Sequence, residues 1–228
     1  MAAGMGVRML PLTENMPKSL LRVAGIPIIE RTLNELPDEI DEVIIIVGYL
    51  ADQIREHFKD SKKKLRFVDC EPKGTAWAVK LCQEIVSGDF LVLNGDDLYS
   101  KKDLIKLIQT ASPAMLAIDA SHKPGFPEEY SRFGRLVIDS ESNFRELKTS
   151  TQDLFSPFYV NVGAYKLNLA YFDYPLVKIK NGEYGLPHTI FQMLDKHKIK
   201  IVPAEFWAPI GFPEDIERAE ELLDEYEK

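Results

Sequence analysis

A continuous β-branched run at residues 42–47 (EVIIIV) constrains the fold of this chain more than any other stretch. A strand that is apolar at every position is buried on both faces, which is typical of a parallel sheet covered by helices. Helical spacing of apolar residues recurs between such runs, and this alternation predicts an α/β fold with right-handed crossovers. The expected helices are 28–36, 51–58, 75–86, 101–110 and 213–226, and the further strands are 65–68, 90–93, 114–120, 133–139, 158–167 and 199–202.

Length and composition narrow the class of protein. The chain has 228 residues, and we expect residues 1–228 to form a single domain. Hydrophobic residues make up 45% and charged residues 28%, which is ordinary for a globular protein. The net charge of −8 disfavours nucleic acid and anionic membranes as partners. Two cysteines without C-x-x-C spacing, no apolar run of membrane-spanning length and no recognisable signal peptide favour a cytoplasmic location.

A second informative stretch is formed by the first 21 residues, MAAGMGVRMLPLTENMPKSLL. Gly4 and Gly6 allow a loop whose backbone N–H groups point inward and bind an anion. Arg8 and Lys18 add two cations, so the stretch suits a polyphosphate. It is not a Walker loop, and Pro11 follows the glycines too closely for the helix of a dinucleotide fingerprint. From the spacing alone, a solvated Gly-rich turn is the alternative interpretation.

Two adjacent carboxylates follow the predicted strand 90–93, in the segment 94–98 (NGDDL). We therefore expect them at the carboxyl edge of a parallel sheet, where such folds bind ligands. Magnesium prefers one or two carboxylates together with phosphate oxygens and water. Asp96 is the candidate Mg²⁺ ligand, and an Asp-rich turn is the alternative.

The N-terminal stretch resembles the opening of the sugar-phosphate nucleotidyltransferase family, roughly L-A-A-G-x-G-T-R-M-x-P-L-T-x-x-x-P-K-x-L-L-x-V-x-G-x-P. Matches to the family's P-x-G-T-A, G-D, N-x-G-x-Y, G-E-Y and G-x-P-E-D elements follow, so the resemblance covers nearly the whole chain. It implies a three-layer Rossmann-like α/β fold, with helices on both faces of a mixed, mostly parallel sheet. Residues 1–120 would form the nucleotide-binding half and residues 121–228 the sugar-binding half.

The resemblance also implies an activity. A sugar 1-phosphate attacks the α-phosphate of a nucleoside triphosphate with Mg²⁺ as cofactor, giving a nucleotide sugar and pyrophosphate. The base and the sugar are not specified, and a homo-oligomer is left open. The implied site residues are the catalytic Arg8, Lys18 and Asp96, with Asp96 also the metal ligand; Ala3, Gly4, Gly6, Gly74 and Thr75 for the nucleotide; and Asn161, Gly163 and Glu183 for the sugar.

The chain departs from the family pattern at several positions. Met1 stands where an apolar strand should end, so we expect the first central strand to be missing, through a misplaced start or a genuine truncation. Residues 147–151 (LKTST) replace an E-K-P motif, with Lys148 as the nearest substitute. Pro209 replaces the family's second metal-binding Asp, which should weaken Mg²⁺ binding. Asp97 is the candidate to compensate, although neighbouring side chains on an extended segment point apart.

These departures keep a second class of function open. A protein that binds nucleotide or regulates a partner without turnover would tolerate the loss of a metal ligand, of the E-K-P motif and of the first strand. The intact N-terminal string and Asp96 favour the enzyme instead.

Overall fold

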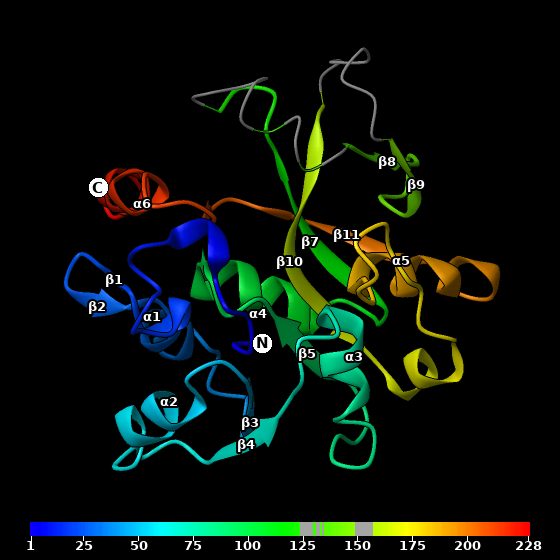
Figure 1. The fold of residues 1–228 in the computed structure, drawn as a ribbon. Coiled ribbons are helices and arrows are strands. Elements are labelled where there is room, and N and C mark those ends of the chain that lie inside the picture. The colour runs from blue at the N-terminus through cyan, green and yellow to red at the C-terminus, as the bar shows by residue number, and fades with distance from the viewer. Residues whose placement is uncertain (124–129, 131–132, 134, 149–156) are drawn as a thin grey trace.

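The structure of the protein is a computed structural model, drawn in Figure 1, and it describes residues 1–123, 130, 133, 135–148 and 157–228. Strands and helices alternate through much of this part of the chain, as the sequence predicted. The α-helices are α1 (Ile28–Asn34), α2 (Ala51–His57), α3 (Thr75–Lys80), α4 (Lys101–Gln109), α5 (Leu186–Phe191) and α6 (Asp215–Tyr226), and the short 3₁₀ helices are η1 (Val7–Met9), η2 (Lys18–Leu20), η4 (Leu169–Asp173) and η5 (Gln192–Asp195).

The sheet is built around β10 (Tyr159–Leu167), the long strand in the middle of Figure 1. β7 (Ala114–Asp119) pairs antiparallel with one edge of β10, and β5 (Phe90–Leu93) pairs antiparallel with the other. β11 (Lys200–Ala204) runs parallel to β7 and extends the sheet. Parallel and antiparallel pairs thus share one sheet, and the mixed α/β class expected from the sequence is confirmed. β8 (Arg135–Ile138) also joins β10 and pairs antiparallel with β9 (Phe144–Lys148).

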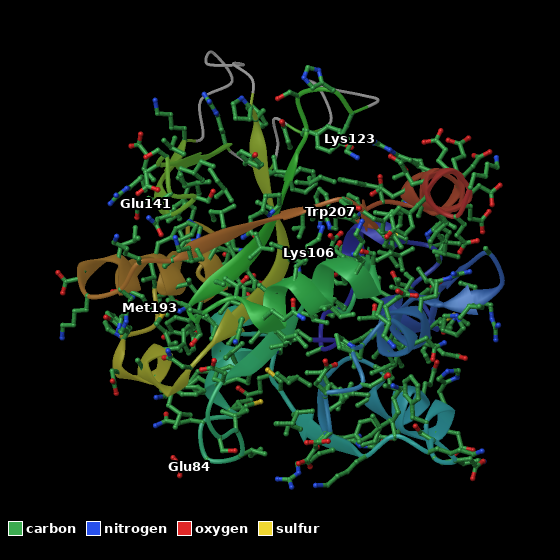
Figure 2. The ribbon with its side chains drawn as sticks, turned by 180° about the vertical axis from the view of Figure 1, so that it is seen from behind. Glu84, Lys106, Lys123, Glu141, Met193 and Trp207 are labelled. Atoms are coloured by element: carbon green, nitrogen blue, oxygen red, sulfur yellow. The ribbon has the colours of Figure 1, made fainter. Side chains whose placement is uncertain are left out.

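Helices cover both faces of this sheet because β7 alternates between two cores. Leu116 packs in one core with Leu104 of α4, whereas Met115 packs in a second core with Val79 of α3 and Ile190 of α5. Figure 2 shows α4, with Lys106 labelled, on the face seen from behind, and Figure 1 shows α3 and α5 on the opposite face. The result is the helix–sheet–helix layering that the sequence predicted.

A separate parallel pair, β3 (Val43–Val47) with β4 (Leu65–Asp69), lies beside the main sheet. The first residues of the chain lie between the carboxyl ends of β3 and β5. The Ala2 N–H donates to the Ile46 carbonyl at 2.8 Å, and the Met1 nitrogen donates to the Leu93 carbonyl at 2.8 Å. Within the described residues Ala2 forms an isolated parallel bridge with Val47 of β3, and no named strand pairs with the facing edges of β3 and β5.

Two short antiparallel pairs complete the described fold. β1 (Arg22–Val23) and β2 (Ile26–Pro27) form a hairpin before α1. β6 (Asp97–Tyr99) follows the turn after β5 and pairs with β12 (Trp207–Pro209), which leads into α6. β6 (DLY), β9 (FRELK) and β12 (WAP) were not predicted, because none of them is a continuous apolar run of the kind that marks β3 and β5.

One helix, α3, is shorter than predicted by more than two residues. The sequence indicated a helix over 75–86, but α3 ends at Lys80. Beyond it the chain continues in turns, in which Cys82 N–H donates to the Val79 carbonyl and Ile85 N–H donates to the Cys82 carbonyl. These i to i+3 bonds keep apolar residues at nearly helical spacing, so the periodicity did not reveal where the helix ends.

Candidate active site

The N-terminal loop is bent in the way its glycines allow. Gly6 has a φ of +61°, and a Cβ there would lie 3.0 Å from Cγ2 of Thr13 and 3.1 Å from Cβ of Lys18. The Thr13 hydroxyl donates to the Gly6 carbonyl at 2.8 Å and fixes the bend. Within the described chain, the N–H groups of residues 4–7 donate no hydrogen bond, so they are available to an anion.

Lys18 and Asp96 come from distant segments and form an ion pair. Lys18 belongs to η2, and its Nζ donates to Oδ2 of Asp96 at 2.5 Å. Asp96 lies in the turn between β5 and β6. The Lys18 side chain is 11% exposed and that of Asp96 is 39% exposed, so the carboxylate is the more open of the two. This geometry places a cation and a carboxylate at one point beside the N-terminal loop.

Two cavities meet at this point. The larger has a volume of about 430 Å³ and the smaller about 300 Å³. Arg8, Lys18 and Asp96 line both cavities, together with Asn94 and Gly211. The three residues predicted as catalytic are therefore placed around a common space. The residues predicted for the nucleotide all line the larger cavity: Ala3, Gly4, Gly6, Gly74 and Thr75.

Arg8 is placed by an aromatic ring. Its guanidinium carbon lies 5.0 Å from the centre of the Phe212 ring, which is a cation–π distance. The turn that carries Phe212 is held by Asp215, whose Oδ2 accepts hydrogen bonds from the N–H groups of Gly211 at 2.6 Å and Phe212 at 2.9 Å. The start of α6 thereby fixes one wall of both cavities.

The three residues predicted for the sugar are divided between the cavities. Asn161 and Gly163 line the smaller one, whereas Glu183 lines the larger one. The Asn161 side chain is engaged within β10: its Oδ1 accepts from the Gly163 N–H at 2.9 Å, and its Nδ2 donates to the Tyr165 hydroxyl at 2.6 Å. Glu183 is thus separated from the other two by the junction of the cavities.

Gly74 and Gly163 are each required by close packing within the protein. A Cβ on Gly74 would lie 2.5 Å from the backbone of Tyr184, and Gly74 has a φ of +102°. Thr75 does not cap α3, because Gly74 is the N-cap residue and the Thr75 hydroxyl instead accepts a hydrogen bond from the Leu186 N–H at 3.0 Å. A Cβ on Gly163 would lie 2.1 Å from Nδ2 of Asn94.

Asp97 is a buried carboxyl group in the smaller cavity. It is 7% exposed, and its Oδ2 accepts hydrogen bonds from the Asn94 amide at 3.1 Å and the Tyr99 hydroxyl at 3.4 Å. Burial, and then the negative charge of Asp96, raise the pKa of Asp97 to about 7. The Trp207 indole N–H gives a smaller, opposite effect on this pKa.

The residues fit a magnesium ion in one specific way. Within the described residues, no group of three or more His, Cys, Asp and Glu side chains could hold a metal ion by itself. Asp96 nevertheless presents a partly exposed carboxylate beside the N-terminal loop, and Mg²⁺ is commonly held by one or two carboxylates plus substrate phosphate oxygens. Pro209 lines the smaller cavity and offers no side-chain ligand.

The sequence missed several residues that shape this site. Tyr99, Phe212 and Trp207 were not predicted to contribute. Tyr99 holds Asp97 by a hydrogen bond, the Phe212 ring places Arg8, and Trp207 lines the smaller cavity. Phe212 had a signal in the sequence, because it lies within the G-x-P-E-D element between Gly211 and Pro213. Lys148 lies on β9, where its Nζ is 3.9 Å from Oε1 of Glu146, and it does not line either cavity. Residues 149–151 lie outside the described part of the chain.

Comparison with known proteins shows the family of this chain. The family model described as nucleotidyl transferase matches residues 1–225. The bifunctional protein GlmU of Methanococcus aeolicus is 32% identical over 220 residues, which cover 95% of this chain and 51% of that protein. The UTP–glucose-1-phosphate uridylyltransferase AglF of Haloferax volcanii is 28% identical over 237 residues, covering 99% of this chain and 95% of that protein.

Solved structures share the fold. A Bacillus anthracis protein assigned as a glucose-1-phosphate thymidylyltransferase superimposes with a TM-score of 0.80 at 20% identity, covering 97% of this chain and 92% of that one. The inositol-1-phosphate CTP transferase from T. maritima superimposes with a TM-score of 0.77 at 17% identity, covering 100% and 94%. At these identities the likeness concerns the fold.

The structure thus defines a mixed α/β protein with two adjoining cavities that share Arg8, Lys18 and Asp96. The chain belongs to the nucleotidyl transferase family, as the resemblance of its N-terminal string implied. It spans about half the length of the GlmU relative and almost the whole of AglF. No helix in the described ranges is long and apolar enough to cross a bilayer.

Proposed function

We propose that the protein joins a sugar 1-phosphate to a nucleoside triphosphate, releasing pyrophosphate in a Mg²⁺-dependent reaction. The observation that carries this proposal is the convergence of Arg8, Lys18 and Asp96 on the junction of two cavities. Two substrates that must react with each other need adjoining sites with the charged groups at the boundary. The nucleotide occupies the larger cavity and the sugar phosphate occupies the smaller one.

The triphosphate is bound by the N-terminal loop. The N–H groups around Gly4 and Gly6 donate to phosphate oxygens, and Arg8 adds positive charge from above the Phe212 ring. Ala3, Gly74 and Thr75 line the rest of the larger cavity and bound the nucleoside.

The reaction is a displacement at phosphorus. An oxygen of the sugar phosphate forms a bond to the α-phosphorus, and the bond from that phosphorus to the bridging oxygen breaks, with its electron pair leaving on pyrophosphate. A phosphate monoester is already ionised near neutral pH, so the attacking group needs no base. Lys18 stabilises the charge that develops on the reacting phosphates. Asp96 would hold Mg²⁺, which when bound neutralises phosphate charge.

The sugar contacts follow from the smaller cavity. Asn161 has a hydrogen on Nδ2 that Tyr165 does not use, and it can donate this hydrogen to a sugar hydroxyl. Gly163 bounds the cavity beside it. Glu183, on the larger cavity, reaches the sugar only if the substrate spans the junction.

The test is pyrophosphate release from each nucleoside triphosphate with glucose 1-phosphate or mannose 1-phosphate and Mg²⁺. UTP with glucose 1-phosphate is the first pair, because the AglF relative carries that activity in its name. Asp96→Asn should abolish turnover, whereas the matched surface change Asp38→Asn should not, since Asp38 pairs only with Lys101 among the described residues. An Asp96→Asn protein with unchanged turnover would refute the assignment of Asp96.

Pro209 favours one competing function, a nucleotide-binding or regulatory protein without turnover. It removes a side-chain ligand from the wall of the smaller cavity. The same assay separates the two functions. Tight binding of a nucleoside triphosphate, with no pyrophosphate released from any pair, would favour the regulatory function.

A further inference from the structure

The smaller cavity is lined by carboxylates on two consecutive residues. Asp96 belongs to the turn after β5, whereas Asp97 is the first residue of β6. On a straight strand the two side chains would point to opposite faces. Asp96 lies in a turn and not on the strand, and both residues line the same cavity. Lys18 pairs with Asp96, but no ion pair to Asp97 occurs in the described ranges.

Neighbouring residues orient the Asp97 carboxylate through hydrogen bonds to one of its two oxygens. Asn94 and Tyr99 both donate to Oδ2. No hydrogen bond within the described part of the molecule reaches Oδ1. Hydrogen bonds from the protein to one oxygen of a carboxylate are typical of metal ligands, because they fix the direction of the other oxygen.

A second observation indicates a missing group at this position. The indole N–H of Trp207 is buried and has no hydrogen-bond partner in the described structure. It faces the Asp97 carboxyl, whose pKa it lowers, but the two groups do not meet in hydrogen-bond geometry, and Trp207 lines the same cavity. A buried donor without a partner beside a half-used carboxylate is the arrangement expected where a bound ion and its water complete the contacts.

We propose that Asp97 is the second carboxylate ligand, beside Asp96, of the divalent cation that this site uses. The inference rests on the proposed nucleotidyl transfer, which supplies the reason for a cation here. The cation is a hard ion such as Mg²⁺ or Mn²⁺, because the ligands are carboxylate oxygens and phosphate oxygens.

The strand register gives this assignment a strong test. Asp97 pairs directly with Pro209 across the β6–β12 ladder, and both residues line the smaller cavity. Directly opposite residues of an antiparallel pair have Cβ atoms about 4.5–5.5 Å apart on one face. A carboxylate placed at position 209 would therefore bind the same ion from the neighbouring strand. Loss of Asp97 should be repaired by Pro209→Asp.

The first experiment measures Mn²⁺ binding by electron paramagnetic resonance, with Mn²⁺ alone and with inorganic pyrophosphate, and needs no turnover. Asp97→Asn should weaken Mn²⁺ binding about 10–100-fold. The control Glu205→Gln removes a surface carboxylate that pairs with Lys102 and Lys106, and its Mn²⁺ affinity should equal that of the wild type. Equal affinity of a folded Asp97→Asn protein and the wild type would overturn the inference.

The double variant Asp97→Asn with Pro209→Asp should regain most of the lost Mn²⁺ affinity. If Asp97→Asn weakens binding and Pro209→Asp restores nothing, Asp97 acts by holding Asn94 and Tyr99 in place, and its assignment as a ligand is wrong.

A second variant, Asp97→Cys, tests the inference through a change in metal preference if Asp97→Asn does not fold. Asp97→Cys should shift the preference of the site from Mn²⁺ toward Cd²⁺, because a thiolate selects softer metals. A folded Asp97→Cys protein with the wild-type ratio of Cd²⁺ to Mn²⁺ affinity would contradict the inference. Failure of the proposed function has a different signature, namely wild-type protein that binds Mn²⁺ but releases no pyrophosphate.

Discussion

A Cβ atom built on Gly163 would lie 2.1 Å from Nδ2 of Asn94, closer than any packed side chain allows. Gly163 also has a φ of +75°, which only glycine adopts without strain. We expect Gly163→Ala to lower the free energy of unfolding by about 2–5 kcal/mol, from about 1–2 for the backbone and about 1–3 for overpacking. Urea unfolding measures this loss.

Gly88 provides the matched control for that prediction. Its φ is +62°, but nothing lies within 4 Å of the position that its Cβ would take. Gly88→Ala should therefore show the backbone cost alone, about 1–2 kcal/mol. Equal losses for the two variants would show that Asn94 moves aside without cost, and the packing argument for Gly163 would be wrong.

Lys18→Met should impair the proposed reaction far more than folding. The change removes the cation that lies 2.5 Å from Asp96 and keeps most of the aliphatic stem. Removal of one group that stabilises charge in the transition state reduces kcat about 10²–10³-fold. Pyrophosphate release measures this loss. The control is Lys102→Met, which removes a surface cation that pairs with Glu205. A Lys18→Met protein within a few-fold of wild-type kcat would remove Lys18 from the mechanism.

Phe212 should act on nucleotide binding through Arg8. Phe212→Leu keeps an apolar side chain but loses the ring beneath the guanidinium. A cation–π contact at an exposed position is worth about 0.5–1 kcal/mol, so we expect KM for the triphosphate to rise about two- to fivefold with kcat nearly unchanged. Phe212→Tyr retains the ring and should behave as wild type. A matching rise of KM in Phe212→Tyr would show that the ring does not place Arg8.

Asp139 should make stability depend on pH in the acid range. The Asn143 amide, and then the N–H groups of Asn143 and Glu141, hold the pKa of Asp139 below its ordinary value of 3.8, and Arg145 pairs with it. A carboxyl group whose pKa is lower in the folded state stabilises the fold above its unfolded pKa, and this contribution is lost as pH falls through the folded pKa.

Thermal unfolding of wild type and Asp139→Asn from about pH 6 to pH 2 tests this dependence. The variant should melt lower near neutral pH, and the difference should shrink as the wild-type carboxylate is protonated. A difference that stays constant over the whole range would show that the Asp139 charge contributes nothing to stability.

The sequence predicted elements best where the signal is local. The strand 90–93 and the helix that begins at residue 101 match β5 and α4 closely, because buried runs and a Ser100 N-cap are encoded within a few residues. The strands β6 and β12 were missed, since they form by pairing between segments far apart in the sequence. The end of α3 was missed because the turns that follow it keep apolar residues at nearly helical spacing.

The sequence by itself determined the α/β class and the glycine-rich character of the N-terminal loop, because hydrophobic periodicity and glycine spacing act over short distances. Only the tertiary structure decided that Asp97 and Asp96 line one cavity, that Asp97 lies opposite Pro209, and that Glu183 lines a different cavity from Asn161. Such relationships depend on strand register and on turns between elements. Register is set by packing across the whole molecule, and a single chain segment does not carry that information.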